Sequence, residues 1–407
     1  MLWLYNIAIQ LYSLIIRIFS LFNTKASLFI NGRKNIFPNI EKKIKAGSPH
    51  IWFHFASLGE FEQGRPVLEK VKEQYPNKKI VITFFSPSGY EIRKNYALAD
   101  GIFYLPLDTA SNAKQLIATL NPELAIFTKY EYWYYYFKEL DKNNIPLLII
   151  SGIFRPNQIF FKPYGSFHRK ILSYVSHFFV QNQESIELLK GINIQNATLS
   201  GDTRFDRVAE NAVTPKKLNV IEKFCGKASV FVAGSTWPED EQLIALLCKK
   251  YPDWKFIIAP HEIGVNHIQE IEKLFPHGIK YSTFATTDEP ATNHQVLIID
   301  NIGMLSNLYY YGKIAYIGGG FGAGIHNTLE AAAFGIPVIF GPKYDKFQEA
   351  KDLIKLNAAK SISNLNELET AFTTLTETAE KGLIAKNYVR SKTGSTDQIV
   401  KYLSKYF

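Results

Sequence analysis

The chain has 407 residues, which is more than one ordinary hydrophobic core accommodates, so two domains are expected. Hydrophobic residues make up 46% of it and charged residues 20%, a balance that excludes an intrinsically disordered protein. The formal net charge of +9 favours an anionic partner, such as nucleic acid, an acidic membrane surface or a phosphorylated substrate, although a generally basic composition without functional meaning gives the same total.

The two cysteines indicate neither a disulfide framework nor a zinc site. Cys225 and Cys248 lie 23 residues apart, with no Cys-x-x-Cys motif and no pair of histidines nearby. A reducing compartment is therefore the expected location.

Residues 1–25 are predicted to be a membrane anchor or an interfacial helix. The first 22 residues form an apolar stretch interrupted by Asn6, Gln10 and Arg17, and a membrane span needs about 20 mostly apolar residues. No basic segment precedes this stretch and no small-residue cleavage site follows it, which argues against a removed signal peptide. Seven basic residues against one acid between residues 1 and 48 place the following chain on the cytoplasmic side. The alternative is a helix buried against the protein's own core.

From residue 50 onward, short apolar runs alternate with amphipathic stretches. This alternation predicts parallel sheets with helices on both faces, and its recurrence in two halves predicts an α/β fold of two Rossmann-like domains facing a cleft. In the first half, strands are expected at 51–55, 79–85, 101–105, 124–127, 147–150, 177–181 and 198–200, and helices at 67–75 and 112–120. In the second half, strands are expected at 230–233, 255–259, 296–299, 314–317 and 338–340, and helices at 239–250 and 328–334.

The domain boundaries are expected where the composition changes. Residues 26–210 are predicted to form the N-terminal domain and residues 224–382 the C-terminal domain. The polar segment 211–223, which contains Pro215, is the expected linker. Residues 383–407 are short and amphipathic and are expected to form a helix that folds back on the first domain.

A glycine-rich turn gives the strongest local signal of the second half. Five glycines occur between residues 318 and 324, directly after an apolar strand, and a helix is expected to begin near His326. Glycines let the backbone approach a ligand, and a helix N-terminus offers N–H groups to a phosphate. His326, Asn327 and Glu330 are expected on one face of this helix, where Glu330 can accept both hydroxyls of a ribose. The alternative is that these glycines serve only tight strand-to-helix packing.

Other polar residues of the second half follow predicted strands. Ser235 and Thr236 end one strand before a helix with acids in its first turn, Pro260 and His261 end another, and Gly303 follows a third. A simple helix N-cap is the alternative role of Ser235 and Thr236. Because the carboxyl ends of parallel strands meet at one edge, these positions are expected to converge where α/β sheets bind ligands.

Four segments taken together resemble the family of 3-deoxy-D-manno-octulosonic acid (Kdo) transferases of lipopolysaccharide synthesis. They read "FHFASLGE", "SGDTRFD", "AGSTWPEDE" and "GGGFGAGIHNTLEAAAFGIPVIFGP", and they extend in the right order over most of the chain. The resemblance implies a GT-B fold and an inverting transfer from the donor CMP-Kdo to a lipid A precursor, lipid IVA, without a metal or a cofactor. The second domain would hold the donor, and the first would present the acceptor.

The resemblance also implies roles for residues of the first half. Glu60 matches the general base of the family, while Glu131 in "KYEYW" and Arg204 in "GDTRFD" match groups that stabilise charge during transfer. Arg155 resembles the arginine of the family's Asn-Ala-Arg motif and is expected on the acceptor side. On the acceptor side, Gly59 would leave room for the acceptor and Ser57 would fix the turn.

In the second half the resemblance implies a CMP-binding site. Pro260 and His261 match a cytidine-contacting pair, and residues 302–304 and 327–330 match two further nucleotide segments. The implied donor-binding residues are Pro260, His261, Ile302, Gly303, Met304, Asn327, Thr328, Leu329, Glu330, Ser235, Thr236, Gly319 and Gly320.

The chain departs from the family pattern at four positions. Lys129 replaces an acid, His261 an arginine, Met304 a glutamate and Arg204 a lysine. Arginine keeps the charge of lysine with a different geometry, whereas histidine for arginine can lose the charge. These departures put the residue roles at the four positions in doubt, but not the fold or the class of reaction.

Glu60 is then expected to be ionised, because it follows a predicted strand at a helix N-terminus, and to take a proton from the acceptor hydroxyl. An ordinary first-turn helix acid, like Glu62, is the alternative. The basic, aromatic segment 159–172 is expected to contact headgroups of the anionic inner membrane at its cytoplasmic face, and residues 131–137 to be mostly core. Nucleic acid is the weaker explanation of the charge because no recognition motif occurs.

Three other classes stay open beside the Kdo transferase. A GT-B enzyme with a UDP-sugar donor would share the fold. A nucleotide-dependent oxidoreductase is disfavoured because no Gly-x-Gly-x-x-Gly motif and no correctly spaced acid follow the strand at 314–317. A membrane-bound sugar-nucleotide binding protein without turnover is the third. The sequence leaves open the number of Kdo units transferred, the acylation of the acceptor and the oligomeric state.

Overall fold

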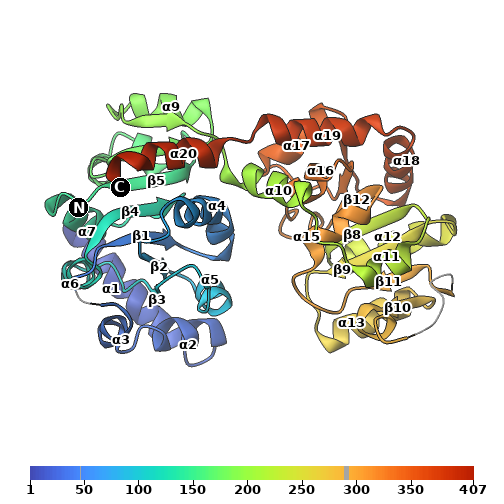
Figure 1. The fold of residues 1–407 in the computed structure, drawn as a ribbon, viewed down its shortest axis with the longest axis horizontal. Coiled ribbons are helices and arrows are strands. Elements are labelled where there is room, and N and C mark those ends of the chain that lie inside the picture. The colour runs from blue at the N-terminus through green and yellow to red at the C-terminus, as the bar shows by residue number, and fades with distance from the viewer. Residues whose placement is uncertain (46, 288–292) are drawn as a thin grey trace. The chain divides into compact units, whose positions relative to one another are not determined.

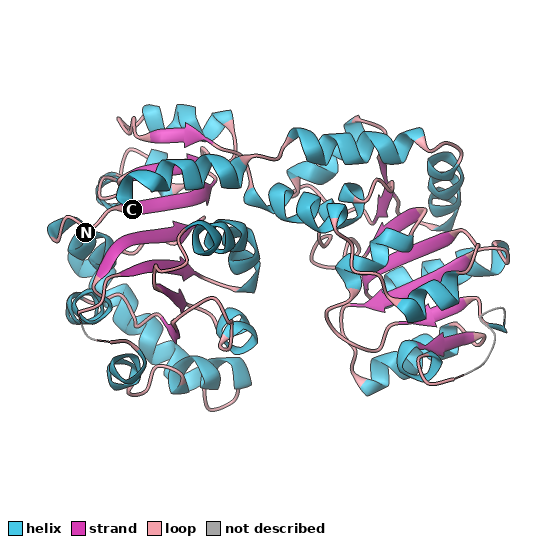
Figure 2. Cartoon of the chain, in the orientation of Figure 1, coloured by secondary structure: helices cyan, strands magenta, loops and turns pink. Residues whose placement is uncertain are grey.

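The computed structural model describes residues 1–45, 47–287 and 293–407 and divides them into two compact units. The first unit comprises Met1–Asp206 together with Thr393–Phe407, and the second comprises Arg207–Lys392. In the described residues each unit contains a seven-stranded parallel sheet flanked by helices (Figures 1 and 2). Both units are therefore Rossmann-like α/β domains, as the alternation of apolar and amphipathic segments predicts.

The unit boundaries differ from those expected from composition. The chain leaves the first unit after Asp206, inside α10 (Thr203–Val213), so the segment 211–223 already belongs to the second unit. It returns after Lys392, so α19 (Glu380–Ser391) stays in the second unit, where it contacts α16 (Leu329–Ala333). α20 (Ser395–Leu403) and the residues after it pack on the first unit, with Ile399 and Leu403 in its core.

The sheet of the first unit is buried on both faces. Along its central strand β1 (His50–Phe55), Ile51, Phe53 and Phe55 join the core that contains α4 (Leu58–Gln74) and α20, whereas Trp52 joins the core on the opposite face. This two-sided burial explains why the strand sequences are continuously apolar. The strand order is β3-β2-β1-β4-β5-β6-β7, with β1 at His50–Phe55, β2 at Ile80–Phe84, β3 at Gly101–Tyr104, β4 at Pro122–Thr128, β5 at Leu147–Gly152, β6 at His177–Val180 and β7 at Ala197–Leu199.

The helices of the first unit cover this sheet and include the segments predicted at 67–75 and 112–120. They are α1 (Leu2–Phe19), α2 (Thr24–Asn31), α3 (Ile36–Lys43), α4 (Leu58–Gln74), α5 (Pro87–Arg93), α6 (Ala110–Leu120), α7 (Tyr134–Lys142), α8 (Ser166–Leu172) and α9 (Gln183–Lys190). The expectation that residues 131–137 are mostly core is confirmed, because Tyr134, Tyr136 and Phe137 are buried.

The N-terminal helix α1 is long and apolar enough, by length and composition, to cross a membrane. No residue of α1 is buried, so the alternative of a helix buried in the core is wrong. One side of the helix nevertheless contacts the first unit: Tyr5 donates a hydrogen bond to Asp108 at 2.5 Å, and Tyr12 stacks on Phe85 with ring centroids 6.1 Å apart. The opposite side exposes large apolar side chains such as Ile7 and Leu11.

The sheet of the second unit has the strand order β10-β11-β9-β8-β12-β13-β14. Its predicted strands are confirmed at β8 (Val230–Thr236), β9 (Lys255–Pro260), β11 (Val296–Ile298), β12 (Ile314–Ile317) and β13 (Val338–Phe340). Two strands were not predicted, β10 (Gly278–Lys280) and β14 (Ala359–Ser361), because each is only three residues long and lies at a sheet edge with little apolar sequence. The further helices are α11 (Asn219–Cys225), α12 (Pro238–Lys250), α13 (Val265–Leu274), α14 (Tyr281–Phe284), α15 (Leu305–Leu308), α17 (Gln348–Lys355) and α18 (Leu365–Thr376).

Each sheet has one point at which the order of strands reverses along the chain. In the first unit this switch point lies between β1 and β4, and in the second between β8 and β12. Open parallel sheets bind ligands outside the carboxyl ends of the strands at such a point. The residues that follow these four strands are therefore the first candidates for a site.

Candidate active site

Glu60 lies in the first turn of α4, directly after β1. The chain leaves β1 at Phe55, Ser57 takes an extended conformation at the N-cap position, and the helix begins at Leu58. The Glu60 carboxylate folds back and accepts a hydrogen bond from the Ala56 N–H at 2.6 Å. The helix continues through Pro66, so this proline does not mark its start. The backbone thus fixes the carboxylate at the switch-point edge of the sheet.

The pKa of Glu60 is raised from its ordinary 4.5 to about 7. Burial is the largest cause, and the negative charge of Glu131 adds to it, while the N–H groups of Ala56 and Ser57 and the charge of Lys129 act in the opposite direction. The expectation that the helix N-terminus keeps Glu60 fully ionised is therefore wrong, because desolvation and a like charge outweigh the N–H groups. A carboxyl with a pKa near 7 is suited to general base catalysis at neutral pH.

Glu131 follows β4, on the other side of the switch point. Its Oε2 accepts hydrogen bonds from His54 Nε2 at 3.1 Å and from Trp133 Nε1 at 2.9 Å. With Nε2 donating to the carboxylate, His54 Nδ1 accepts from the Thr83 hydroxyl at 2.8 Å, and Thr83 in turn accepts from Trp52 Nε1. A directed chain of hydrogen bonds therefore holds Glu131 in place from inside the sheet.

Two strand ends near these acids have an unusual backbone. Lys129, at the end of β4, has φ 66°, and Ser151, at the end of β5, has φ 51°. Both residues lie in the left-handed region of backbone conformation. This conformation costs free energy for residues other than glycine, and residues that adopt it are concentrated at functional sites. Beyond β5, the exposed Arg155 donates a hydrogen bond from Nη1 to Tyr130 at 3.1 Å. Arg155 and Lys129 thus add positive charge to this edge.

Of the three residues predicted on the acceptor side, Ser57 is half-buried, whereas Gly59 and Arg155 are exposed. A Cβ built on Gly59 would meet only Ser57 Oγ, at 3.9 Å. Packing within the protein therefore does not require glycine at position 59.

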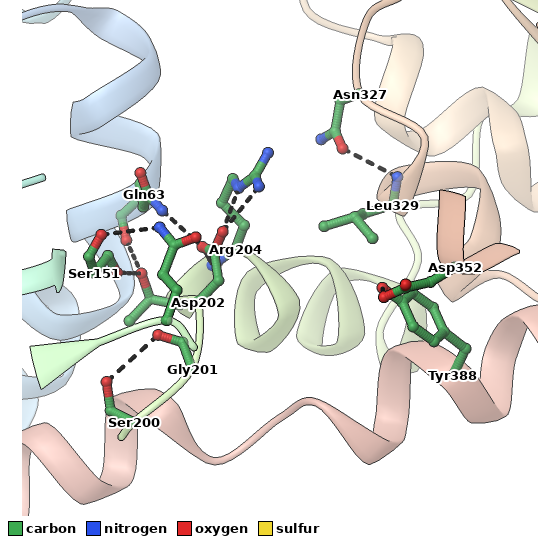
Figure 3. A network of polar contacts seen from close by, with 12 residues as sticks. Gln63, Ser151, Ser200, Gly201, Asp202, Arg204, Asn327, Leu329, Asp352 and Tyr388 are labelled. Atoms are coloured by element: carbon green, nitrogen blue, oxygen red, sulfur yellow. Dashed lines mark hydrogen bonds and ion pairs between the residues drawn. The ribbon is translucent and has the colours of Figure 1, made fainter. Parts of the chain in front are cut away.

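Arg204 is held by the carboxylate of Asp202 (Figure 3). Its Nε and Nη2 lie 2.9 and 2.8 Å from Asp202 Oδ2. Burial acts to raise the pKa of Asp202, but the neighbouring Arg204 lowers it below its ordinary value, so the pair is charged. Gln63 donates to Asp202 from α4 at 2.8 Å, which links this pair to the helix that carries Glu60.

In the second unit, Ser235 and Thr236 form the end of β8. Ser235 has φ 54° in the left-handed region, and Thr236 donates a hydrogen bond to Glu241 at 2.9 Å. Trp237, not Ser235 or Thr236, occupies the N-cap of α12, so the simple capping explanation of this pair is wrong. Pro260 ends the neighbouring β9, and the His261 N–H donates to the Thr236 carbonyl at 3.0 Å.

Three rings from separate segments stack at this edge. Trp237 and His261 lie with ring centroids 5.0 Å apart and planes at 24°, and His261 and His326 lie 4.4 Å apart at 25°. Burial and the neighbouring His261 lower the pKa of His326 to about 4, so His326 is neutral at pH 7. His261 is itself exposed and therefore offers an accessible ring at the position of the arginine in the family pattern.

The glycine-rich turn after β12 serves packing more than the sequence indicates. A Cβ on Gly318 would lie 2.2 Å from the Ser235 carbonyl oxygen, and a Cβ on Gly320 would lie 2.6 Å from Gly341 Cα. The Gly319 N–H donates to Asp240 at 2.9 Å, and the N–H groups of Gly322 and Gly324 donate to the Gly319 carbonyl. Most of the N–H groups expected to cradle a phosphate are therefore occupied within the protein.

The helix after this turn starts later than predicted. It begins at Leu329, so His326 and Asn327 precede it and do not share its face with Glu330. Asn327 accepts from the Leu329 N–H at 3.0 Å at the start of the helix (Figure 3), and its amide donates to Glu330 at 3.1 Å. The buried Thr328 Oγ1 has no hydrogen-bond partner in the structure. A buried hydroxyl without a partner is a vacancy that a ligand can fill.

The segment 302–304 follows β11 as an exposed turn. Ile302 is 85% exposed, Gly303 has φ 95°, and Met304 is the N-cap of α15.

Two groups of residues are thus brought together by the fold. The first unit collects Glu60, Glu131 and Lys129 at the β1/β4 switch point, and the second unit collects Thr236, His261 and His326 near the β8/β12 switch point. Sequence reasoning did not find His54, Trp133, Asp202, Trp237 or Asp240. The available signal for His54 was a histidine inside an otherwise apolar strand. The stacking of Trp237 on His261 could not be found from the sequence, because no spacing rule connects the two segments.

Comparisons with known proteins find similar sequences among Kdo transferases. The sequence model of the 3-deoxy-D-manno-octulosonic-acid transferase (Kdo transferase) family matches residues 31–207. The 3-deoxy-D-manno-octulosonic acid transferase of Aquifex aeolicus is 29% identical over 84% of this chain and 90% of its own length. The enzyme of the same name from Rickettsia felis is 27% identical over 80% of this chain and 71% of its own length, and that of Chlamydia muridarum is 26% identical over 84% and 81%.

Solved structures share the fold at low sequence identity. UDP-GlcNAc 2-epimerase from Neisseria meningitidis, bound to UDP-GlcNAc, covers 88% of this chain and 100% of its own with a TM-score of 0.61 and 16% identity. A glycosyltransferase from Rickettsia africae covers 88% and 98% with a TM-score of 0.56 and 12% identity. The two Rossmann-like units and the sequence relatives together define a glycosyltransferase of the GT-B type. Within that class, the chain is similar to the Kdo transferases, by the family model over residues 31–207 and by the Aquifex and Rickettsia relatives over 84% and 80% of its length.

Proposed function

We propose that this Kdo transferase moves Kdo from CMP-Kdo to a lipid A precursor, lipid IVA, with inversion at the anomeric carbon, without a metal ion, and with Glu60 as the general base. The observation that carries the proposal is the Glu60 carboxyl, fixed at the β1/β4 switch point with a pKa near 7. An acid in this state can accept a proton at neutral pH, which an ordinary exposed glutamate does poorly.

The proposed transfer requires one base. The acceptor hydroxyl gives its proton to the Glu60 carboxylate while its oxygen forms a bond to the anomeric carbon of Kdo. The bond between that carbon and the phosphate oxygen breaks, and CMP leaves with the electron pair. Positive charge near the leaving phosphate stabilises this step, and we assign that role to Arg204, whose charge is maintained by Asp202. The negative charge of Glu131 raises the pKa of Glu60.

We assign donor binding to the second unit. Glu330, half-buried and bonded to Asn327, is proposed to accept the ribose hydroxyls. The unpartnered hydroxyl of Thr328 beside it supports a ligand at this position. The exposed His261 ring, stacked on His326, is proposed to contact the cytosine base. Because the N–H groups of the glycine turn are mostly occupied, Gly319 and Gly320 are proposed to shape the site and not to bind the phosphate.

The donor is tested by nucleotide binding and by product formation. We expect CMP to bind the purified protein more tightly than UDP, and CMP-Kdo to be converted to CMP and a Kdo-bearing lipid in vesicles that contain the lipid A precursor. Tighter binding of UDP would favour a UDP-sugar donor, and tight NAD(P) binding would favour an oxidoreductase. Binding of CMP-Kdo without a lipid product would indicate a binding protein.

The pH dependence of transfer is expected to follow Glu60. The carboxylate form increases as the pH rises through a pKa of about 7, so kcat/KM is expected to rise up to that pH and then level. Replacing Glu131 by glutamine removes the like charge that raises this pKa, so the midpoint of the profile is expected to move to lower pH. Glu139→Gln, which breaks the ion pair of a half-buried acid with the exposed Lys142, is the matched control and is expected to leave the midpoint unchanged. A midpoint that stays the same in Glu131→Gln would contradict the coupling between the two acids.

We also propose that the protein acts on the cytoplasmic face of the inner membrane, with α1 lying in the interface and not across the bilayer. Tyr5 and Tyr12 contact the first unit two helical turns apart, so the helix is attached lengthwise. The half-buried residues of α1 recur every three or four positions along this side, and the opposite side is apolar and exposed. Such a helix is suited to an interfacial position. Lys170 and Tyr164, both exposed in the segment 159–172, can contact headgroups beside it.

A further inference from the structure

A pocket of about 570 Å³ lies in the first unit among α1, α2, α3 and the segment that follows β3. This volume is within the roughly 300–1,000 Å³ typical of small-molecule sites. Its described lining contains three cationic side chains and no carboxylate: Arg17, Arg33 and Lys34. The rest of the wall is mainly apolar and includes Phe29, Ile30, Ile36, Phe37, Pro38, Pro106 and Leu107. The pocket therefore combines positive charge with a hydrocarbon surface.

Arg33 is the deepest of these cations. Its guanidinium donates three hydrogen bonds, to the main-chain carbonyls of Leu105, Phe29 and Phe85 at 2.8, 2.9 and 2.7 Å. All three acceptors are uncharged, and in the described parts of the chain no ion pair is recorded for Arg33. Burial lowers the pKa of Arg33 to about 9, which still leaves it protonated at neutral pH. The pocket thus holds a positive charge that an anionic ligand would compensate.

Aromatic contacts connect the pocket to the candidate active site. Phe29 lines the pocket and packs edge-on against Phe85 with ring centroids 5.3 Å apart. Phe85 packs against Trp133 at 4.9 Å, and Trp133 donates to the Glu131 carboxylate. The pocket and the pair Glu60 and Glu131 are therefore separated by a short row of side chains within one compact unit. Beside the pocket, α1 carries the exposed apolar face that we assign to the membrane.

We propose that this pocket binds the acceptor lipid, with a phosphate of the acceptor at Arg17, Arg33 and Lys34 and one of its acyl chains along the apolar wall. This inference rests on the proposed function, because it assumes an acylated and phosphorylated acceptor whose sugar hydroxyl reaches Glu60. It adds a second point of attachment for that acceptor, away from the reacting hydroxyl. The pocket would select an acceptor that carries both a phosphate and a hydrocarbon chain.

The test compares two changes to the pocket with two matched changes outside it. Leu107→Trp fills the apolar wall without altering charge, and Leu28→Trp adds the same bulk at an exposed position of α2 that does not line the pocket. The double variant Arg17→Gln/Lys34→Gln removes two exposed charges from the rim, and Lys25→Gln removes an exposed charge from α2 outside it. Binding of the acylated lipid A precursor, its deacylated form and CMP is measured for each variant in detergent micelles.

The two pocket variants are expected to distinguish the contribution of the acyl chain to binding from that of the phosphate. Leu107→Trp is expected to weaken binding of the acylated precursor by about tenfold, because its acyl chain loses part of the apolar wall, and to leave binding of the deacylated form unchanged. The double variant is expected to weaken both forms by about tenfold. CMP binding and both control variants are expected to match the wild type.

Unchanged binding of the acylated precursor in both pocket variants would overturn the inference. Equal competition by phosphatidylglycerol would also overturn it, because the pocket would then serve bulk phospholipid and not the acceptor. Transfer from CMP-Kdo is measured with the same wild-type preparation. If transfer fails there, the proposed function fails. If transfer succeeds while the pocket variants bind the precursor normally, only this inference fails.

Discussion

Replacing Glu60 by glutamine is expected to lower the rate of Kdo transfer by about 10³-fold, which is within the range for loss of a general base. Glutamine has the size of glutamate, and its carbonyl oxygen can still accept the hydrogen bond from the Ala56 N–H. The turn between β1 and α4 is therefore expected to keep its conformation, while the group that takes the acceptor proton is lost. The rate is measured as lipid product formed at saturating CMP-Kdo, and CMP binding is measured in parallel.

The matched control for this variant lies two residues further along the same helix. Glu62 forms ion pairs with Arg65 and Arg93 at the surface, and Glu62→Gln is expected to change the transfer rate by less than about twofold, since exposed ion pairs contribute little. CMP binding is expected to match the wild type in both variants. A Glu60→Gln enzyme that transfers Kdo at the wild-type rate would show that Glu60 is not the general base.

Placing charges on the outer face of α1 is expected to abolish most of the membrane binding. Ile7, Leu11 and Ile18 are 50, 53 and 53% exposed and point away from the first unit. Burying one such side chain in hydrocarbon is worth roughly 1.5–3 kcal/mol, so replacing all three by glutamate is expected to weaken binding to anionic vesicles by at least about a hundredfold. Co-flotation with vesicles measures this effect.

The control variant changes three exposed leucines of the second unit in the same way. Leu246, Leu356 and Leu383 are 44, 42 and 57% exposed, and their replacement by glutamate is expected to leave flotation unchanged. In sealed vesicles, a protease added outside is expected to cleave a tag on the N-terminus of the wild-type protein, because an interfacial helix keeps both of its ends on one side. A protected tag would contradict the interfacial position and favour a spanning helix.

Much of the fold follows from the sequence because both sheets are covered on two faces. Burial on both sides makes central strands such as β1 and β8 continuously apolar, and that pattern can be read directly. The short edge strands β10 and β14 are less apolar and were missed. The division inside α10 could not be predicted either, since a helix that continues from one unit into the next has no break in its periodicity.

The positions of the main site residues could be predicted from the sequence, but the interactions between them could not. Motifs led to Glu60 and Glu131, yet the elevated pKa of Glu60 depends on burial and on the proximity of Glu131, which lies 71 residues away in the chain. The hydrogen-bond chain through His54 and the stack of Trp237 on His261 likewise join distant segments. In the glycine turn, composition indicated phosphate binding, whereas close backbone packing accounts for Gly318 and Gly320.

The charge state of Glu60 is the central claim of this account, and carbon-13 NMR of glutamate side chains tests it most directly. A carboxyl resonance that disappears in Glu60→Gln is expected to titrate near pH 7 in the wild-type protein, and at lower pH in Glu131→Gln. A resonance for Glu60 that titrates at the ordinary glutamate value in the wild type would show that neither burial nor Glu131 prepares this acid to act as a base.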